Sequence, residues 1–267
     1  MPVRTGAGEA VAAPPQPASD PGSAEWSHPV DDGPEEAVTS LTDHLTELRD
    51  RLLICLSSIG GFTVVCLFFS SWLIDWLKAT APAGLHFYTT NPTEAFSVYV
   101  KTAAVAGLVL SVPVISYHLW EFIRPGLHHS ERAMTSAFAP AFVILFFTGA
   151  LFARYAAVPM GVAFLVDFAQ GIAEPLYTVG DYTGFVLQLM MICGILFEFP
   201  ILLYMAGSMG FVTTELLRRK RRLVIFWIFV ISAALTPSVD IGTQLAMAVP
   251  IVLLYEATIL LMRVRGM

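Results

Sequence analysis

Charge is scarce in this chain. Only 13% of its residues are Asp, Glu, Lys or Arg, whereas 56% are apolar. Soluble domains usually carry about twice that share of charge, so the composition excludes most soluble classes and indicates an integral membrane protein. Cysteine is also rare. Cys55, Cys66 and Cys193 all lie within apolar runs without disulfide or metal-ligand spacing, which indicates buried, inert thiols.

Motifs for catalysis and phosphate binding are missing too. The sequence contains no Gly-x-Ser-x-Gly, no His-Glu-x-x-His and no glycine-rich phosphate-binding loop. It carries no nucleic-acid signature, and nothing in it would bind ATP. We therefore expect no enzymatic activity, no cofactor, no metal and no nucleic-acid partner.

The first part of the chain is acidic and lacks apolar periodicity. Residues 1–43 contain eight acidic residues against one basic residue, Arg4, and they are rich in Pro, Ala and Gly. Such a segment cannot bury enough apolar surface to fold, so we expect disorder. It also lacks the apolar core of a secretory signal. We divide the chain into a disordered acidic tail at 1–39, a membrane domain at 40–263 and a short tail at 264–267.

Six apolar runs follow the acidic tail. Five are long enough to cross a bilayer, which takes about 20 apolar residues; they cover residues 52–74, 96–120, 133–153, 182–206 and 241–262. The run at 223–235 would form a helix of only about 20 Å, against a hydrocarbon core of about 30 Å, and would need local thinning of the bilayer. A few residues around Pro237 separate it from the last run, which predicts a tight hairpin. The sequence thus predicts an all-α integral membrane protein with six transmembrane helices.

Proline lies inside four of these predicted helices, at Pro113, Pro140, Pro200 and Pro250. Each removes a backbone donor and tends to kink its helix, which predicts a curved bundle. Membrane helices also carry prolines with no specific role. The connecting segments at 75–95 and 159–181 are long, so we expect them to fold, the second with a short surface helix at 160–169.

The basic residues predict the orientation of the chain. Five of them follow one another at 218–222, between two apolar runs. With both termini in the cytoplasm, eleven basic residues face the cytoplasm and three face the opposite side, the distant Arg4 being left out. Cytoplasmic segments retain Lys and Arg, so we expect both termini inside. The eleven are Arg49, Arg51, Arg124, Arg132, Arg218, Arg219, Lys220, Arg221, Arg222, Arg263 and Arg265, and the three are Lys78, Lys101 and Arg154.

Two segments on the predicted cytoplasmic side concentrate polar residues. Glu47 and Arg51 are four residues apart in an amphipathic stretch that starts the first helix, in the order that favours an ion pair. The loop at 120–132 carries Glu131 and Arg132. Both segments also fit a plainer interpretation, a surface helix whose charges pair with one another and a solvated turn that anchors the topology.

Glu198 is a carboxylate within the apolar run at 182–206. A charge in such a region is costly and usually faces the bundle interior or a wet cavity, so we interpret Glu198 as functional. Pro200 leaves a nearby backbone carbonyl without its usual partner, which favours a local polar pocket. The candidate partners of Glu198, among which the sequence does not choose, are Gln188, Thr243 and Gln244.

Five segments match the motifs of a known family in order and spacing. Residues 44–52 read HLTELRDRL, residues 91–96 NPTEAF, residues 122–132 FIRPGLHHSER and residues 197–200 FEFP, and the last hairpin carries LTP at 235–237 before Asp240 and Gln244. Over residues 40–263 the sequence resembles TatC, the multi-spanning subunit of the twin-arginine protein translocase. The acidic tail is not part of the resemblance.

The resemblance implies a receptor rather than an enzyme. In the family, the cytoplasmic surface binds signal peptides that carry two adjacent arginines on folded cargo, and the matching carboxylates here are Glu47 and Glu131. Each carboxylate can accept two hydrogen bonds from one guanidinium, a geometry that lysine lacks. The resemblance further implies that the carboxylates are oriented by Arg49, Arg51 and Arg132, and that the apolar flank of the peptide contacts Phe122.

The resemblance also implies partners and a location. TatA-like and TatB-like single-span proteins would pack against the fourth to sixth helices, with Glu198, Asp240 and Gln244 as polar docking points. It further implies self-association in a larger receptor complex, contact with membrane lipid and use of the proton-motive force. The expected location is the bacterial plasma membrane, with several spans and both termini cytoplasmic.

Other function classes stay open. Glu198 and Lys101 could form the proton relay of a solute or ion transporter, although no inverted repeat is visible. An intramembrane enzyme would need a nucleophile with its base, or paired aspartates, within the helices, and the sequence has neither. A purely structural scaffold is a further possibility, but it would not explain why a carboxylate, Glu198, lies within an apolar run.

Overall fold

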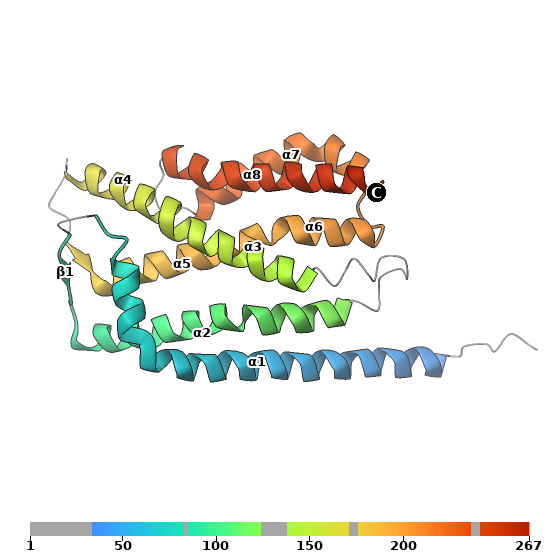
Figure 1. Cartoon of the computed structure of the whole chain (residues 1–267), viewed down its shortest axis with the longest axis horizontal. Helices are drawn as coiled ribbons and strands as arrows, with labels where there is room; N and C mark the ends of the chain where they lie inside the picture. The colour runs from blue at the N-terminus through green and yellow to red at the C-terminus, as the bar shows by residue number, and fades with distance from the viewer. Residues whose placement is uncertain (1–33, 83–84, 124–137, 171–175, 236–240, 267) are drawn as a thin grey trace, which may run out of the picture. The chain divides into compact units, whose positions relative to one another are not determined.

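The structure is a computed structural model that describes residues 34–82, 85–123, 138–170, 176–235 and 241–266. Most of it belongs to one compact unit, Leu45–Met267 (Figure 1). The elements are α1 (Pro34–Lys78), β1 (Phe87–Tyr88), α2 (Pro92–Ile123), α3 (Phe138–Phe152), a π-helical turn (Ala153–Ala157), α4 (Val158–Gln170), β2 (Tyr177–Thr178), α5 (Val179–Phe197), α6 (Phe199–Ser208), α7 (Thr214–Leu235) and α8 (Ile241–Val264).

Five helical segments of the described chain are long and apolar enough to cross a membrane. They are Leu45–Lys78, Pro92–Ile123, Phe138–Ala169, Val179–Ser208 and Ile241–Val264. Each contains most of one predicted apolar run, which confirms an all-α membrane domain.

The predicted fifth crossing, unlike the other five, does not form a helix with an apolar stretch of spanning length. The run at 223–235 forms the second half of α7, whose first half carries the basic cluster at 218–222. This cluster is therefore helical and not part of a loop. It also leaves α7 without an apolar stretch of spanning length, so a sixth crossing stays a prediction.

The third span is longer than its apolar run suggests. The helix predicted at 160–169 exists, but it continues the span and is not a separate surface helix, because α3, the π-helical turn and α4 follow one another without a break. Pro159 lacks a backbone donor and normally interrupts a helix. Here it is the second residue of α4, directly after the π-helical turn, and such turns accommodate irregular hydrogen bonding inside long helices.

The fourth span is interrupted at Glu198. Helix α5 ends at Phe197 and α6 begins at Phe199, with Pro200 in the first turn of α6. Proline cannot donate to the carbonyl four residues earlier, so the ladder of hydrogen bonds stops there. The interruption expected at Pro200 is thus present, whereas Pro113 and Pro250 lie inside continuous helices.

The two segments that connect the spans at the far end from Arg51 pair with each other. Strands β1 and β2 run parallel, with Phe87 opposite Tyr177 and Tyr88 opposite Thr178. We call this end of the unit the strand end. The end that holds residues 47–51, 118–123, 214–222 and 263–265 is the basic end.

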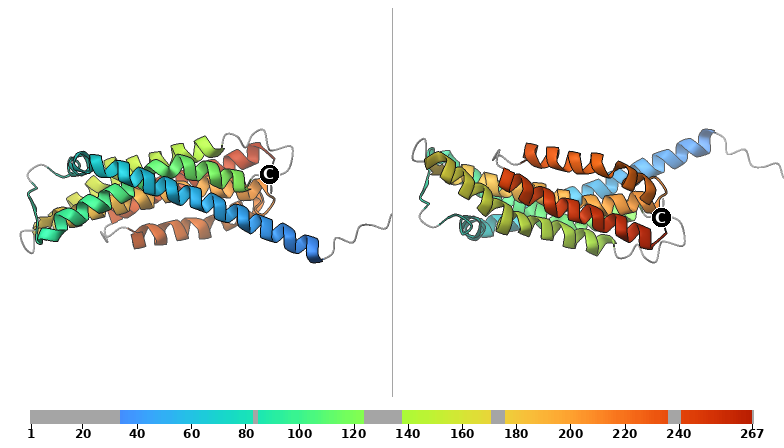
Figure 2. Two further views of the ribbon diagram at one scale, coloured as in Figure 1. Left: turned by 90° about the horizontal axis from the view of Figure 1, so that it is seen from below. Right: turned by 90° about the horizontal axis from the view of Figure 1, so that it is seen from above.

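Helices α5 and α6 form the middle of the unit. Helix α5 packs against α2, α3 and α8, while α8 also packs against α6 and α7 (Figures 1 and 2). Glycine permits the close approach of α3 to α5, because a Cβ at Gly149 of α3 would lie 2.5 Å from the Cys193 carbonyl oxygen of α5. In contrast, only 6% of the apolar window of α1 is buried, so most of α1 faces outward.

Candidate functional site

At the basic end, α1 carries an ion pair that also holds it to α2. The guanidinium of Arg51 contacts the Glu47 carboxylate. A second nitrogen of Arg51 donates to the His118 carbonyl oxygen of α2 at 3.1 Å. Arg51 is mostly buried, whereas the Glu47 side chain remains 41% exposed. Because Arg51 is fixed by α2, it fixes the position of a carboxylate that other molecules can still reach.

The other residues predicted for this site have surroundings of their own or fall outside the described residues. Arg49 pairs with its exposed neighbour Asp50 at 2.8 Å. Phe122 lies in the last turn of α2 and is partly buried. Glu131 and Arg132 fall outside the described residues. Their distance from Glu47 thus stays untested.

Glu198 is buried between helices, with only 4% of its surface exposed. Its carboxylate lies beside the backbone of Phe146 in α3, but among the described residues neither of its oxygens completes a hydrogen bond. A buried carboxyl group without a hydrogen bond costs stability.

None of the predicted partners of Glu198 bonds to it in the described structure. The Gln244 amide donates to the Phe229 carbonyl oxygen at 3.1 Å, which ties α8 to α7. Gln188 lines a separate cavity near the strand end. Thr243 is buried near the start of α8, and Asp240 falls outside the described residues.

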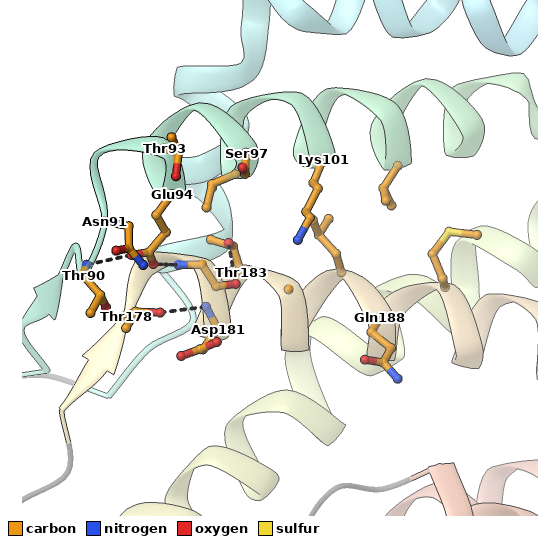
Figure 3. A pocket seen from close by; sticks show the side chains of 16 residues that line it. Thr90, Asn91, Thr93, Glu94, Ser97, Lys101, Thr178, Asp181, Thr183 and Gln188 are labelled. Carbon is orange, nitrogen blue, oxygen red and sulfur yellow. Dashed lines mark hydrogen bonds between the residues drawn. The ribbon is translucent and has the colours of Figure 1, made fainter.

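The sequence did not predict a cavity of about 650 Å³ that lies between α2 and α5 and is lined by many polar side chains. Glu94 organises its mouth, because its carboxylate accepts hydrogen bonds from the backbone amides of Thr90 at 2.7 Å and Gly180 at 2.8 Å. Lys101 extends into the cavity from α2 (Figure 3). Glu94 belongs to the NPTEAF motif, so the motif is the signal that could have indicated this site.

The cavity also bears on the transporter interpretation. Lys101 lines it, but Glu198 does not. The described structure therefore does not bring together the two residues of the suggested proton relay.

Glu94→Ala is expected to loosen the strand end and lower the unfolding midpoint of the purified protein by a few degrees. The variant leaves the Gly180 amide, in the first turn of α5, without a charged acceptor that also joins α5 to Thr90 before α2. Thermal unfolding in detergent measures the effect. Asp181→Ala removes the same charge from the cavity wall but not the bridge between α5 and Thr90, so it should lower the midpoint much less. Equal shifts in both variants would contradict a bridging role for Glu94.

Comparison with known proteins defines the family of the chain. The family model described as Sec-independent protein translocase protein (TatC) matches residues 43–250. The chain belongs to the TatC family. A TatC of Frankia casuarinae is 37% identical over 85% of this chain and 66% of its own length. A TatC of Synechocystis is 35% identical over 89% of this chain and 93% of its own length.

Solved TatC structures share the fold. A crystal structure of the twin-arginine translocase receptor TatC is 34% identical and has a TM-score of 0.72. The match covers 84% of this chain and all of that one. The chain is therefore a membrane-embedded TatC subunit of the Sec-independent, twin-arginine system, a transport protein that works with other Tat subunits.

Proposed function

We propose that the chain is the receptor of its translocase and binds twin-arginine signal peptides of folded cargo through Glu47 and Glu131. The observation that carries the proposal is the half-exposed Glu47 carboxylate, held by an Arg51 that is itself bonded to the His118 carbonyl oxygen. A carboxylate that already accepts a guanidinium in the resting protein has the orientation that an incoming arginine needs. Arg49, Phe122 and Arg132 complete the proposed surface.

The proposal includes the arrangement in the membrane. The chain crosses the bacterial plasma membrane six times with both termini in the cytoplasm, and the acidic tail at 1–39 lies on that side. The charge asymmetry supports this orientation, since the basic end gathers most of the Lys and Arg residues. Helix α7 would cross through its short apolar half, where the bilayer is locally thinned.

The proposed partners are TatA-like and TatB-like single-span subunits, which pack near α5 to α8. Support comes from Glu198, whose buried carboxylate has no completed hydrogen bond among the described residues and could accept one from a polar side chain of a partner helix. Asp240 and Gln244 are the other proposed docking points. The assembly contains several receptor copies and moves cargo with the proton-motive force.

Photocrosslinking to signal peptides tests the receptor proposal. The photoreactive residue replaces Leu48, which is 42% exposed, or Ser130, so that both carboxylates stay intact. We expect an Arg-Arg peptide to crosslink and a Lys-Lys peptide to crosslink poorly. Glu47→Ala and Glu131→Ala should each weaken binding of the Arg-Arg peptide about tenfold or more, because each removes one charge-assisted pair.

Asp50→Ala is the matched control for the crosslinking experiment. It removes a neighbouring exposed carboxylate that pairs with Arg49 and should leave peptide binding intact. Equal labelling by both peptides, unaffected by either glutamate variant, would remove this model. Solute uptake by the lone protein in vesicles would then favour a transporter.

A further inference from the structure

A second cavity, at the basic end, has no role in the receptor model. It has a volume of about 370 Å³ and lies between α7 and α8. We call it the basic cavity. It is lined by Arg218, Arg221, Glu256, Ile259, Leu260 and Arg263.

The basic cavity carries an excess of positive charge. Three arginines face one carboxylate, so the lining has a formal charge of +2. The Nε of Arg221 pairs with Oε1 of Glu256 at 2.6 Å, which fixes Arg221 between the two helices. Among the described residues, Arg218 and Arg263 form no ion pair. The cavity therefore presents guanidinium groups whose charge this part of the chain does not neutralise.

The position of the cavity joins this charge to apolar surface. On α7, the basic cluster is followed directly by the apolar half of the helix, which begins at Leu223. Leu223 is 54% exposed, and Leu260 on α8, which lines the cavity, is 61% exposed. Both leucines are directed away from the core of the unit. The basic cavity thus combines guanidinium groups with the exposed Leu260, and exposed apolar surface of α7 follows its basic cluster.

We propose that the basic cavity binds the phosphate headgroup of an anionic phospholipid. Arginine forks match the geometry of phosphate oxygens and form paired hydrogen bonds with them. The acyl chains would lie along Leu260 and the apolar half of α7, where a membrane protein faces hydrocarbon. A free phosphate ion shares the headgroup chemistry but makes no use of that apolar surface. Basic pockets between membrane helices are a recurrent form of such lipid sites.

Lipid counting by native mass spectrometry tests the proposal on the full-length protein. The detergent-purified chain is titrated with phosphatidylglycerol, with phosphatidylcholine and with inorganic phosphate. We expect saturable binding of phosphatidylglycerol, much weaker binding of phosphatidylcholine and no displacement of the lipid by inorganic phosphate. The double variant Arg218→Gln, Arg263→Gln should weaken phosphatidylglycerol binding roughly tenfold or more.

The basic cluster offers a matched control. The double variant Arg219→Gln, Arg222→Gln removes the same net charge from the same end of the protein, but neither residue lines the cavity. It should keep phosphatidylglycerol binding within a factor of about two, since only diffuse attraction is lost. Arg263→Gln alone replaces the first double variant if that variant fails to fold, because Arg263 is exposed and lies outside the Arg221–Glu256 pair.

Three results would overturn the proposal. Equal losses in the two double variants would show general surface attraction without a site. Displacement of the lipid by inorganic phosphate would assign the cavity to a free anion. Unchanged lipid binding in the cavity variants would place any bound lipid elsewhere. The proposal does not depend on peptide binding at Glu47, so the two can fail separately.

Discussion

Gly107→Leu is expected to prevent α1 from packing on α2 and to lower the stability of the protein steeply. A Cβ on Gly107 of α2 would lie 2.5 Å from the backbone nitrogen of Thr63 and 2.6 Å from its Cα in α1. These are backbone atoms, so no flexible side chain can move aside. The two helices would have to separate at their crossing.

Several other contacts of α1 lie away from this crossing. Arg51 bonds to the His118 carbonyl oxygen, and the Ser70 hydroxyl lies 3.3 Å from the Tyr99 carbonyl oxygen. Near the end of α1, Arg154 donates to the Trp76 carbonyl oxygen at 2.5 Å, and Leu77 packs in the core. With 6% of its apolar window buried, α1 depends on a narrow line of contact. We expect a loss of about 3 kcal/mol, the upper part of the usual range for overpacked positions.

The thermal unfolding midpoint of the detergent-purified protein measures this loss, and export of a twin-arginine reporter should fall with it. Gly61→Leu is the matched control, because a Cβ at Gly61 in the same part of α1 meets nothing within 4 Å. That variant should behave like the unmodified protein. Similar midpoints for the two variants would show that the close approach at Gly107 contributes little to stability.

Glu198→Leu is expected to stabilise the isolated protein and to abolish transport. The carboxyl group is buried, with both oxygens lacking a completed hydrogen bond among the described residues. Replacing it with an apolar side chain removes a desolvation cost of about 1–3 kcal/mol, so the unfolding midpoint should rise. Export should fall, because the leucine removes the proposed docking point for a partner helix.

Glu198→Gln separates the two effects. The amide is nearly the same size and still polar, so it retains most of the desolvation cost and should raise the midpoint little. Unfolding midpoints and export of the same reporter are compared across the three proteins. A lower midpoint for Glu198→Leu would mean that the carboxyl group stabilises the fold, and unchanged export would remove Glu198 from the docking surface.

The sequence alone determined the features of this protein that depend on neighbouring residues of the chain. Apolar runs long enough to span a bilayer predicted the membrane class and the five long helices, because the bilayer requires each segment to satisfy its backbone internally. Pro200 indicated the interruption beside Glu198, since a missing donor acts within one helical turn. The spacing of Glu47 and Arg51 likewise predicted their ion pair.

The tertiary structure alone determined the contacts that form between two separate helices or strands. It joined Arg51 to the His118 carbonyl oxygen, brought Gly107 against Thr63, and paired β1 with β2. It also extended the third helix through Pro159, and it formed the cavity between α2 and α5 from helices that are distant in the sequence. The packing of α7 against α8 likewise brought together the arginines of the basic cavity. These features arise from the fit between surfaces, and a linear pattern carries no information about which residues of two helices meet.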